Sequence, residues 1–135
     1  MDAFVAKIAL TLLTGSGASG PGTTLTLALT ASGDTGLPYL VGSSLGSGPM
    51  WIGNRQVGLD PDDLLVVTVN NYLPSIFSGY RGLIGPHGQA AAAIHIPADN
   101  RLIGLRIHSA FVTLSPSAPQ GIKSISNTFS FSITK

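Results

Sequence analysis

The sequence predicts an all-β fold, namely an antiparallel β-sandwich with Greek-key or jelly-roll-like connections. Three observations support this prediction. Apolar and polar residues alternate in many short segments, clusters of glycine, serine and proline separate these segments, and no segment shows a sustained helical stripe between caps. The 135 residues suit a single domain over positions 1–135, which is long enough to bury one core. A closed β-barrel is the alternative architecture.

Six segments alternate with the period of two that is typical of strands. Apart from residues 3–13, each presents one apolar face and one face that is mainly polar or small, as in antiparallel sheets that are covered on one side. The segments are residues 3–13, 24–30, 65–70, 89–96, 102–113 and 129–134. Because aromatic residues make up only 7% of the chain, we expect a core of leucine, isoleucine, valine and alanine.

Turn-forming residues separate the predicted strands. Clusters of glycine, serine, asparagine, aspartate and proline occupy residues 15–22, 32–36, 85–88 and 116–121. Residues 97–100 are predicted to join their neighbouring strands as a hairpin. Asp60 is predicted to cap a single helical turn, with Pro61 at the first helical position. Residues 72–81 have no clean period and are expected to form a loop or crossover.

Charged residues are sparse, at 10% of the chain with a net charge of +1 and no glutamate; a typical domain has about 25%. The basic residues are dispersed, which excludes the basic stripe of a nucleic-acid-binding protein. The longest apolar run is too short to span a membrane, and without cysteine neither a disulfide nor a thiolate metal site is possible. Two interpretations of the surface stay open: it is rich in neutral hydroxyl groups, or much of it is buried against other copies.

The N-terminal segment is apolar on both faces if residues 3–13 form a strand. One face carries Phe4 and Ile8, and the other carries Val5, Ala9 and Leu13. Such a strand needs cover on both sides, whereas a two-sheet sandwich covers only one. We therefore expect a neighbouring copy to contact these five residues, with residues 1–13 as a strand exchanged at an exposed sheet edge. An acidic second residue and a short apolar run argue against the alternative, a signal peptide.

A sugar-binding platform is the second candidate site. Trp51 lies between turn-forming residues and is followed by Asn54 and Arg55, and Tyr80 lies in the segment Gly-Tyr-Arg-Gly. Aromatic side chains offer an apolar face for a sugar ring together with a polar edge, and the polar neighbours would bind its hydroxyl groups. The alternative, which the sequence favours, is that Trp51 closes one end of the core.

Residues with metal-binding or catalytic chemistry are few and scattered. The histidines are His87, His95 and His108, and the last two are expected on exposed strand faces without a common site. The acidic cluster at residues 60–63 lacks the spacing of an EF-hand. The chain has no cysteine, no G-x-S-x-G motif and no evident pair of catalytic carboxylates. We expect no metal, no cofactor and no enzymatic activity.

Four stretches, taken in order, resemble a known family: residues 36–46, 60–64, 96–105, and 110–114 with Ser126-Asn127. The chain resembles the C-terminal β domain of secreted, repeat-bearing proteins of planctomycete-like bacteria. The resemblance covers roughly residues 14–135, and its motifs are turns and strand cores. It implies an extracellular or cell-surface accessory domain without catalytic residues. The two cysteines common in that family are absent here, so a shared disulfide does not carry over.

The composition, the N-terminal segment and the resemblance together predict a non-enzymatic, extracellular structural or adhesive module that self-associates into an oligomer or fibre. Copies of the same chain are the expected partner. The alternative is a carbohydrate-binding module of a secreted protein, with cell-surface glycans as its partner. Neither a nucleic-acid partner nor a membrane span is expected.

Overall fold

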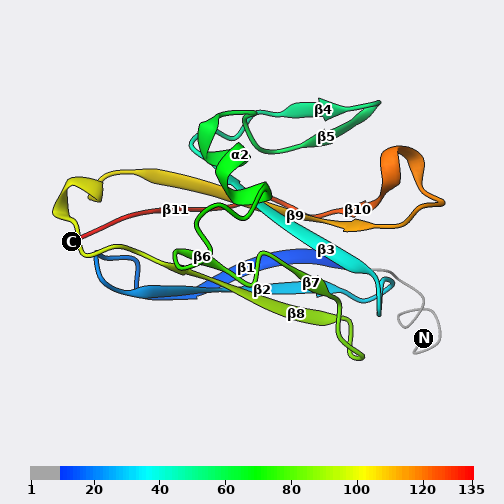
Figure 1. Cartoon of the computed structure of the whole chain (residues 1–135), viewed down its shortest axis with the longest axis horizontal. Helices are drawn as coiled ribbons and strands as arrows, with labels where there is room; N and C mark the ends of the chain where they lie inside the picture. The colour runs from blue at the N-terminus through cyan, green and yellow to red at the C-terminus, as the bar shows by residue number, and fades with distance from the viewer. Residues whose placement is uncertain (1–9) are drawn as a thin grey trace.

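Two antiparallel β-sheets face each other in the computed structural model, which describes residues 10–135 (Figure 1). Sheet A consists, in spatial order, of β1 (Thr11–Gly17), β2 (Thr24–Ala31), β8 (Gln89–His95) and β6 (Phe77–Ser78). Sheet B consists of β10 (Ile122–Ile125), β9 (Arg106–Leu114), β3 (Pro38–Ser44) and β7 (Arg81–Leu83), and β11 (Phe129–Ser132) also pairs with β9. The predicted all-β sandwich is confirmed.

Smaller elements cover the outer face of sheet B. They are the hairpin of β4 (Met50–Ile52) and β5 (Arg55–Val57) and the helix α2 (Asp63–Val69), which lie at the top of Figure 1. Two 3₁₀ turns, η1 (Asn100–Leu102) and η2 (Pro119–Gly121), lie in connections between strands. The chain thus covers both faces of sheet B itself, which a plain two-sheet sandwich would not do.

The main core lies between the two sheets and follows the predicted alternation. Leu25, Leu27 and Leu29 of β2 are at most 4% exposed, and Ile94 of the neighbouring strand β8, which pairs with Leu25, is 1% exposed. Burying a leucine or isoleucine side chain stabilises a fold by about 1.5–3 kcal/mol. The predicted faces of residues 24–30, 89–96 and 129–134 are therefore confirmed.

A second buried cluster forms where α2 and the β4–β5 hairpin meet sheet B. It consists of Val57, Leu59, Leu65 and Ala110. The close approach depends on Gly42 of β3, because a Cβ atom there would lie 2.7 Å from the Cδ1 atom of Leu65. Small side chains in the middle of sheet B thus let the helix pack closely against it.

The prediction of a strand at residues 65–70 is wrong, because residues 65–69 belong to α2 and Asn70 is its C-cap. The Val-Val-Thr-Val run resembles a strand since β-branched residues favour sheets. The helix begins instead at an N-cap, Asp62, whose Oδ1 atom accepts a hydrogen bond from the Leu65 N–H at 3.0 Å. The predicted cap at Asp60 is therefore also wrong, by two residues. Burial of Leu65 and Thr68 against sheet B outweighs the local preference.

Residues 97–100 do not form the predicted hairpin. They lead from β8 in sheet A to β9 in sheet B, so they cross between the sheets. Asp99 caps η1 by accepting a hydrogen bond from the Arg101 N–H at 3.0 Å. As a result, β9 begins only at Arg106, and Ile103 and Leu105 lie outside the strand at 39% and 36% exposure.

In the described part of the first predicted strand, Leu13 points inward and the residues on either side of it point outward. Leu13 is 1% exposed and lies in the core, whereas Leu10 and Leu12 are 50% and 37% exposed. Strand β1 starts at Thr11 and continues to Gly17, through part of the predicted loop, and Leu13 pairs with the buried Leu29 of β2. This pairing directs Leu13 inward, so its predicted contact with a neighbouring copy is wrong.

Candidate binding site

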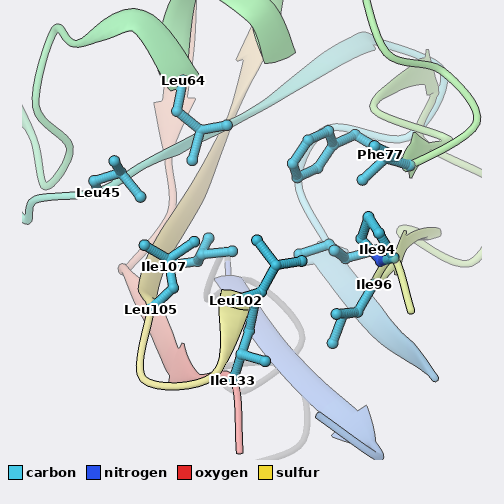
Figure 2. A pocket seen from close by; sticks show the side chains of 11 residues that line it. Leu45, Leu64, Phe77, Ile94, Ile96, Leu102, Leu105, Ile107 and Ile133 are labelled. Carbon is cyan, nitrogen blue, oxygen red and sulfur yellow. The ribbon is translucent and has the colours of Figure 1, made fainter. Parts of the chain in front are cut away.

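An apolar cleft opens at one end of the sandwich, between the two sheets. It has a volume of about 240 Å³, and residues from both sheets and from the crossing segments line it. Figure 2 shows Phe77, Ile94 and Ile96 on one side, Leu45, Leu105 and Ile107 on the other, and Leu102 between them. The full lining is Leu45, Leu64, Ile76, Phe77, Ile94, Ile96, Pro97, Leu102, Leu105, Ile107 and Ile133.

The floor and the rim of the cleft come from different kinds of element. Strand residues form the floor: Ile94 and Ile107 are 1% and 4% exposed. The rim comes from connections, since η1 contributes Leu102 and the following turn contributes Leu105. Gly104 makes that turn possible with a φ of +95°, which other residues rarely adopt. Two backbone hydrogen bonds to Ile133, both 2.8 Å, fasten the turn to the C-terminal segment.

The rim exposes large apolar side chains to solvent. Leu45 is 49% exposed and Leu105 36%, and Ile103 beside it is 39% exposed. Grouped apolar exposure of this kind marks interaction sites, whereas single exposed apolar residues are ordinary. An apolar cavity of about 150 Å³ accepts a benzene molecule. The cleft, at about 240 Å³, can therefore accept an aromatic side chain.

The lining has no polar or titratable side chain. The cleft therefore offers burial of apolar surface and shape, without a proton donor, a nucleophile or a metal ligand. Acidic residues stand beside it instead. Asp63 is exposed next to Leu64, and Asp60 lies against Gly46, the residue after Leu45. Within residues 10–135 neither of these two carboxylates forms an ion pair.

Trp51 does not close the core. It is 62% exposed on β4, where it pairs with Gln56 of β5 across the hairpin. Met50 and Ile52, its neighbours in β4, pack against the second buried cluster, so the alternation of the strand directs Trp51 outward. Asn54 is exposed at the hairpin turn. The core interpretation of Trp51 is wrong, and the structure leaves Trp51, Asn54 and Gln56 accessible on one hairpin.

Tyr80 and Arg55 do not join this group as free ligand-binding residues. Tyr80 is 1% exposed, its hydroxyl lies 2.7 Å from the Ser43 Oγ atom, and burial raises the pKa of Tyr80 to about 12. It packs on Phe77 with ring centroids 5.3 Å apart, because the chain crosses here from β6 to β7. The predicted ligand role of Tyr80 is wrong. Arg55 donates hydrogen bonds to the backbone carbonyls of Ile122 and Lys123, which fastens the hairpin to β10.

Two of the three histidines, His95 and His108, lie in different sheets, and each is bonded to hydroxyl groups. In sheet A, the His95 Nδ1 atom lies 3.1 Å from the Thr24 Oγ1 atom, and the His95 Nε2 atom lies 3.0 Å from the Ser78 Oγ atom. His108, in sheet B, lies 2.6 Å from the Ser130 Oγ atom. Over residues 10–135 no three histidine, cysteine, aspartate or glutamate side chains come together as metal ligands. In the same range no helix is long and apolar enough to span a membrane.

The other residues predicted for self-association, Phe4, Val5, Ile8 and Ala9, lie outside the described part of the chain. No family model matches the chain, and no curated protein is significantly similar to it. The resemblance to the β domain of secreted bacterial proteins therefore stays a prediction.

Proposed function

We propose that this chain is a non-enzymatic structural or adhesive module, and that its apolar cleft receives apolar side chains of a second copy. The observation that carries the proposal is the composition of the cleft, which is lined by apolar residues alone and has an exposed apolar rim. We place the module outside the cell or at its surface as part of the same proposal, on the basis of the family resemblance.

A second copy fits the cleft better than a small diffusible ligand does. Sites for small molecules usually combine an apolar lining with a few polar groups that fix the orientation of the ligand. The lining here provides no polar side chain. Protein interfaces, by contrast, concentrate apolar residues at their centre and exclude charge from it. The low charge of the whole chain, 10%, also reduces the mutual repulsion that keeps copies apart.

The edge strand β1 of sheet A is a poorer site for association than the cleft. At β1, the Asn127 side chain accepts a hydrogen bond from the Leu13 N–H at 2.7 Å and donates one to the Leu13 carbonyl at 3.0 Å. The amide thus occupies the backbone groups that an added strand would need. We therefore replace strand exchange at β1 with side-chain burial in the cleft as the mode of association.

The substitution Leu105→Asp tests the proposal, with Leu83→Asp as its matched control. Leu105 lines the cleft at 36% exposure, whereas Leu83 is 65% exposed on β7 and is not part of the lining. Burying a leucine contributes about 1.5–3 kcal/mol, so a charge at Leu105 should weaken association more than tenfold. Light scattering should show assembly for the unmodified chain and for Leu83→Asp, and loss of assembly for Leu105→Asp. Unchanged assembly of a folded Leu105→Asp variant would overturn the proposal.

Glycan binding at the β4–β5 hairpin is the second candidate function, favoured by the exposure of Trp51 beside Gln56 and Asn54. An exposed indole with polar neighbours can stack on a sugar ring while amides bind its hydroxyl groups. A glycan array tests this function with the unmodified chain and with Trp51→Ala. Binding that disappears in Trp51→Ala supports it, and the absence of binding by the unmodified chain removes it.

A further inference from the structure

We infer that the occupant of the cleft is the segment of residues 1–9 from the next copy, so that the chains associate head to tail. This inference rests on the proposed function and specifies which part of the second copy enters the cleft. It draws on the position of Leu10, the sequence of residues 1–9 and the charges beside the cleft.

Leu10, the first described residue, lies at the end of sheet A opposite the cleft. Leu10 accepts a hydrogen bond from the Ser32 N–H through its carbonyl and donates one to the Ser32 side chain, both within 2.9 Å. From there β1 runs toward the other end, where the C-terminus and the yellow crossing segment lie in Figure 1. Gly17 pairs with Leu25, and Leu25 pairs with Ile94, so the cleft residue Ile94 is level with Gly17.

This separation limits which residues of the segment can reach the cleft of their own chain. Gly17 follows Leu10 by seven residues, which corresponds to about 23 Å of extended strand. Phe4 precedes Leu10 by six residues, which cover about 20 Å when fully extended. The backbone of Phe4 therefore falls short of the level of Ile94 in its own chain, and the backbones of Val5 and Ile8, which are closer to Leu10 in the sequence, fall shorter still. The cleft of a neighbouring copy has no such limit.

The segment and the cleft are chemically complementary. Within residues 1–9, Phe4, Val5 and Ile8 are large apolar residues, and the cleft volume of about 240 Å³ accommodates an aromatic ring. Lys7 is the single basic residue of the segment. It would face Asp60 and Asp63, which stand beside the cleft without an ion pair among the described residues. Apolar burial would supply the affinity, and the charges would set the orientation.

A contact between two different surfaces of the same molecule is heterologous. Such contacts build rings if the rotation closes, and otherwise open filaments. Because the register of β1, β2 and β8 places Leu10 and the cleft residue Ile94 at opposite ends of sheet A, successive copies are expected to continue in one direction. We therefore expect open chains whose length grows with concentration.

A complementation experiment tests the inference. The full-length variant Phe4→Asp/Ile8→Asp loses the donor segment, and Leu105→Asp loses the acceptor cleft. Each variant alone should remain monomeric in light scattering, whereas an equimolar mixture should give particles of twice the monomer mass, because one donor and one acceptor remain. Circular dichroism confirms that both variants are folded, and Leu45→Asp, at 49% exposure, replaces Leu105→Asp if the latter does not fold.

The outcomes separate this inference from the proposed function. Continued assembly of folded Leu105→Asp and Leu45→Asp overturns the proposed function. Loss of assembly in those variants together with continued assembly of the donor variant overturns only the inference, and so does a mixture that stays monomeric.

Disulfide trapping provides a second measurement, because the chain has no cysteine of its own. An oxidised mixture of Phe4→Cys with Leu105→Cys should give a crosslinked dimer, and Phe4→Cys with Leu83→Cys should give at least tenfold less. Equal yields in the two mixtures would overturn the inference.

Discussion

Asn127 should stabilise the fold by closing the seam between β1 and the neighbouring strands of sheet B. Its amide makes two hydrogen bonds to the backbone of Leu13, at 2.7 and 3.0 Å, across a separation of 114 residues. Each such bond contributes about 0.5–1.5 kcal/mol net. Because Asn127 is itself exposed and water can partly replace it, we expect Asn127→Ala to lower the free energy of unfolding by about 1–2 kcal/mol.

Urea denaturation measures this loss. With a slope of about 1.5 kcal/mol per molar urea, the midpoint should fall by roughly 1 M. Asn70→Ala is the matched control, since the Asn70 amide makes one exposed bond, to the Val66 carbonyl, and its removal should cost less than about 0.5 kcal/mol. A midpoint of Asn127→Ala within error of Asn70→Ala would refute the assigned role of the amide.

Three further predictions follow from the described contacts. Asp62→Ala should lower the free energy of unfolding by about 1–2 kcal/mol in a denaturant melt, because Asp62 caps α2 and also accepts a hydrogen bond from the Leu45 N–H. Asp60→Ala should leave it nearly unchanged. Equal losses for the two variants would contradict the cap assignment. Burial alone raises the pKa of Asp34, but hydrogen bonds from Lys123 and Thr113 and the lysine charge lower it overall. The stability contributed by Asp34 should therefore be present above about pH 4 and be lost as the pH falls through its folded pKa. Acid titration of the Asp34→Asn variant should lack that loss. Identical acid unfolding curves for the variant and the unmodified chain would contradict the pairing of Asp34 with Lys123. EDTA should leave the melting temperature unchanged, since residues 10–135 hold no cluster of three metal-ligating side chains, and a drop restored by added Ca²⁺ or Zn²⁺ would contradict this.

The alternation of apolar residues was sufficient to predict the fold class and the faces of several strands. Leu25, Leu27 and Leu29 face the core as expected, since burial on one side of a sheet imposes the period of two directly. Alternation failed where a strand is apolar on both faces, because the pattern then does not say which face is inner. For β1 only the pairing with β2 decides, and it directs Leu13 inward.

Local sequence patterns do not predict the cleft. It brings together Leu45, Phe77, Ile94 and Leu105, from four separate parts of the chain, through the crossing of residues 97–105 from one sheet to the other. No spacing in the sequence encodes that juxtaposition. The sequence contains a partial signal, since residues 72–81, which supply Phe77, lack a clean period and are predicted to form a loop or crossover.

The site at Trp51 illustrates a different limit. Its exposure depends on the β4–β5 hairpin, which places Met50 and Ile52 against the second cluster and Trp51 on the opposite face. A three-residue strand is too short for its alternation to be recognised in the sequence. The helix α2 shows the same dependence on context, because the Asp62 cap and the contact with Gly42 decide its conformation against the preference of its valines.

The mass of the unmodified chain as a function of concentration tests the central claim, association of copies through the cleft, most directly. Static light scattering from micromolar to millimolar concentration should give a mean mass that rises steadily above the 13.8 kDa of one chain without reaching a plateau. The rise should vanish in Leu105→Asp and persist in Leu83→Asp. A mass that stays at 13.8 kDa throughout this range would contradict the claim and leave a monomeric binding module as the better account.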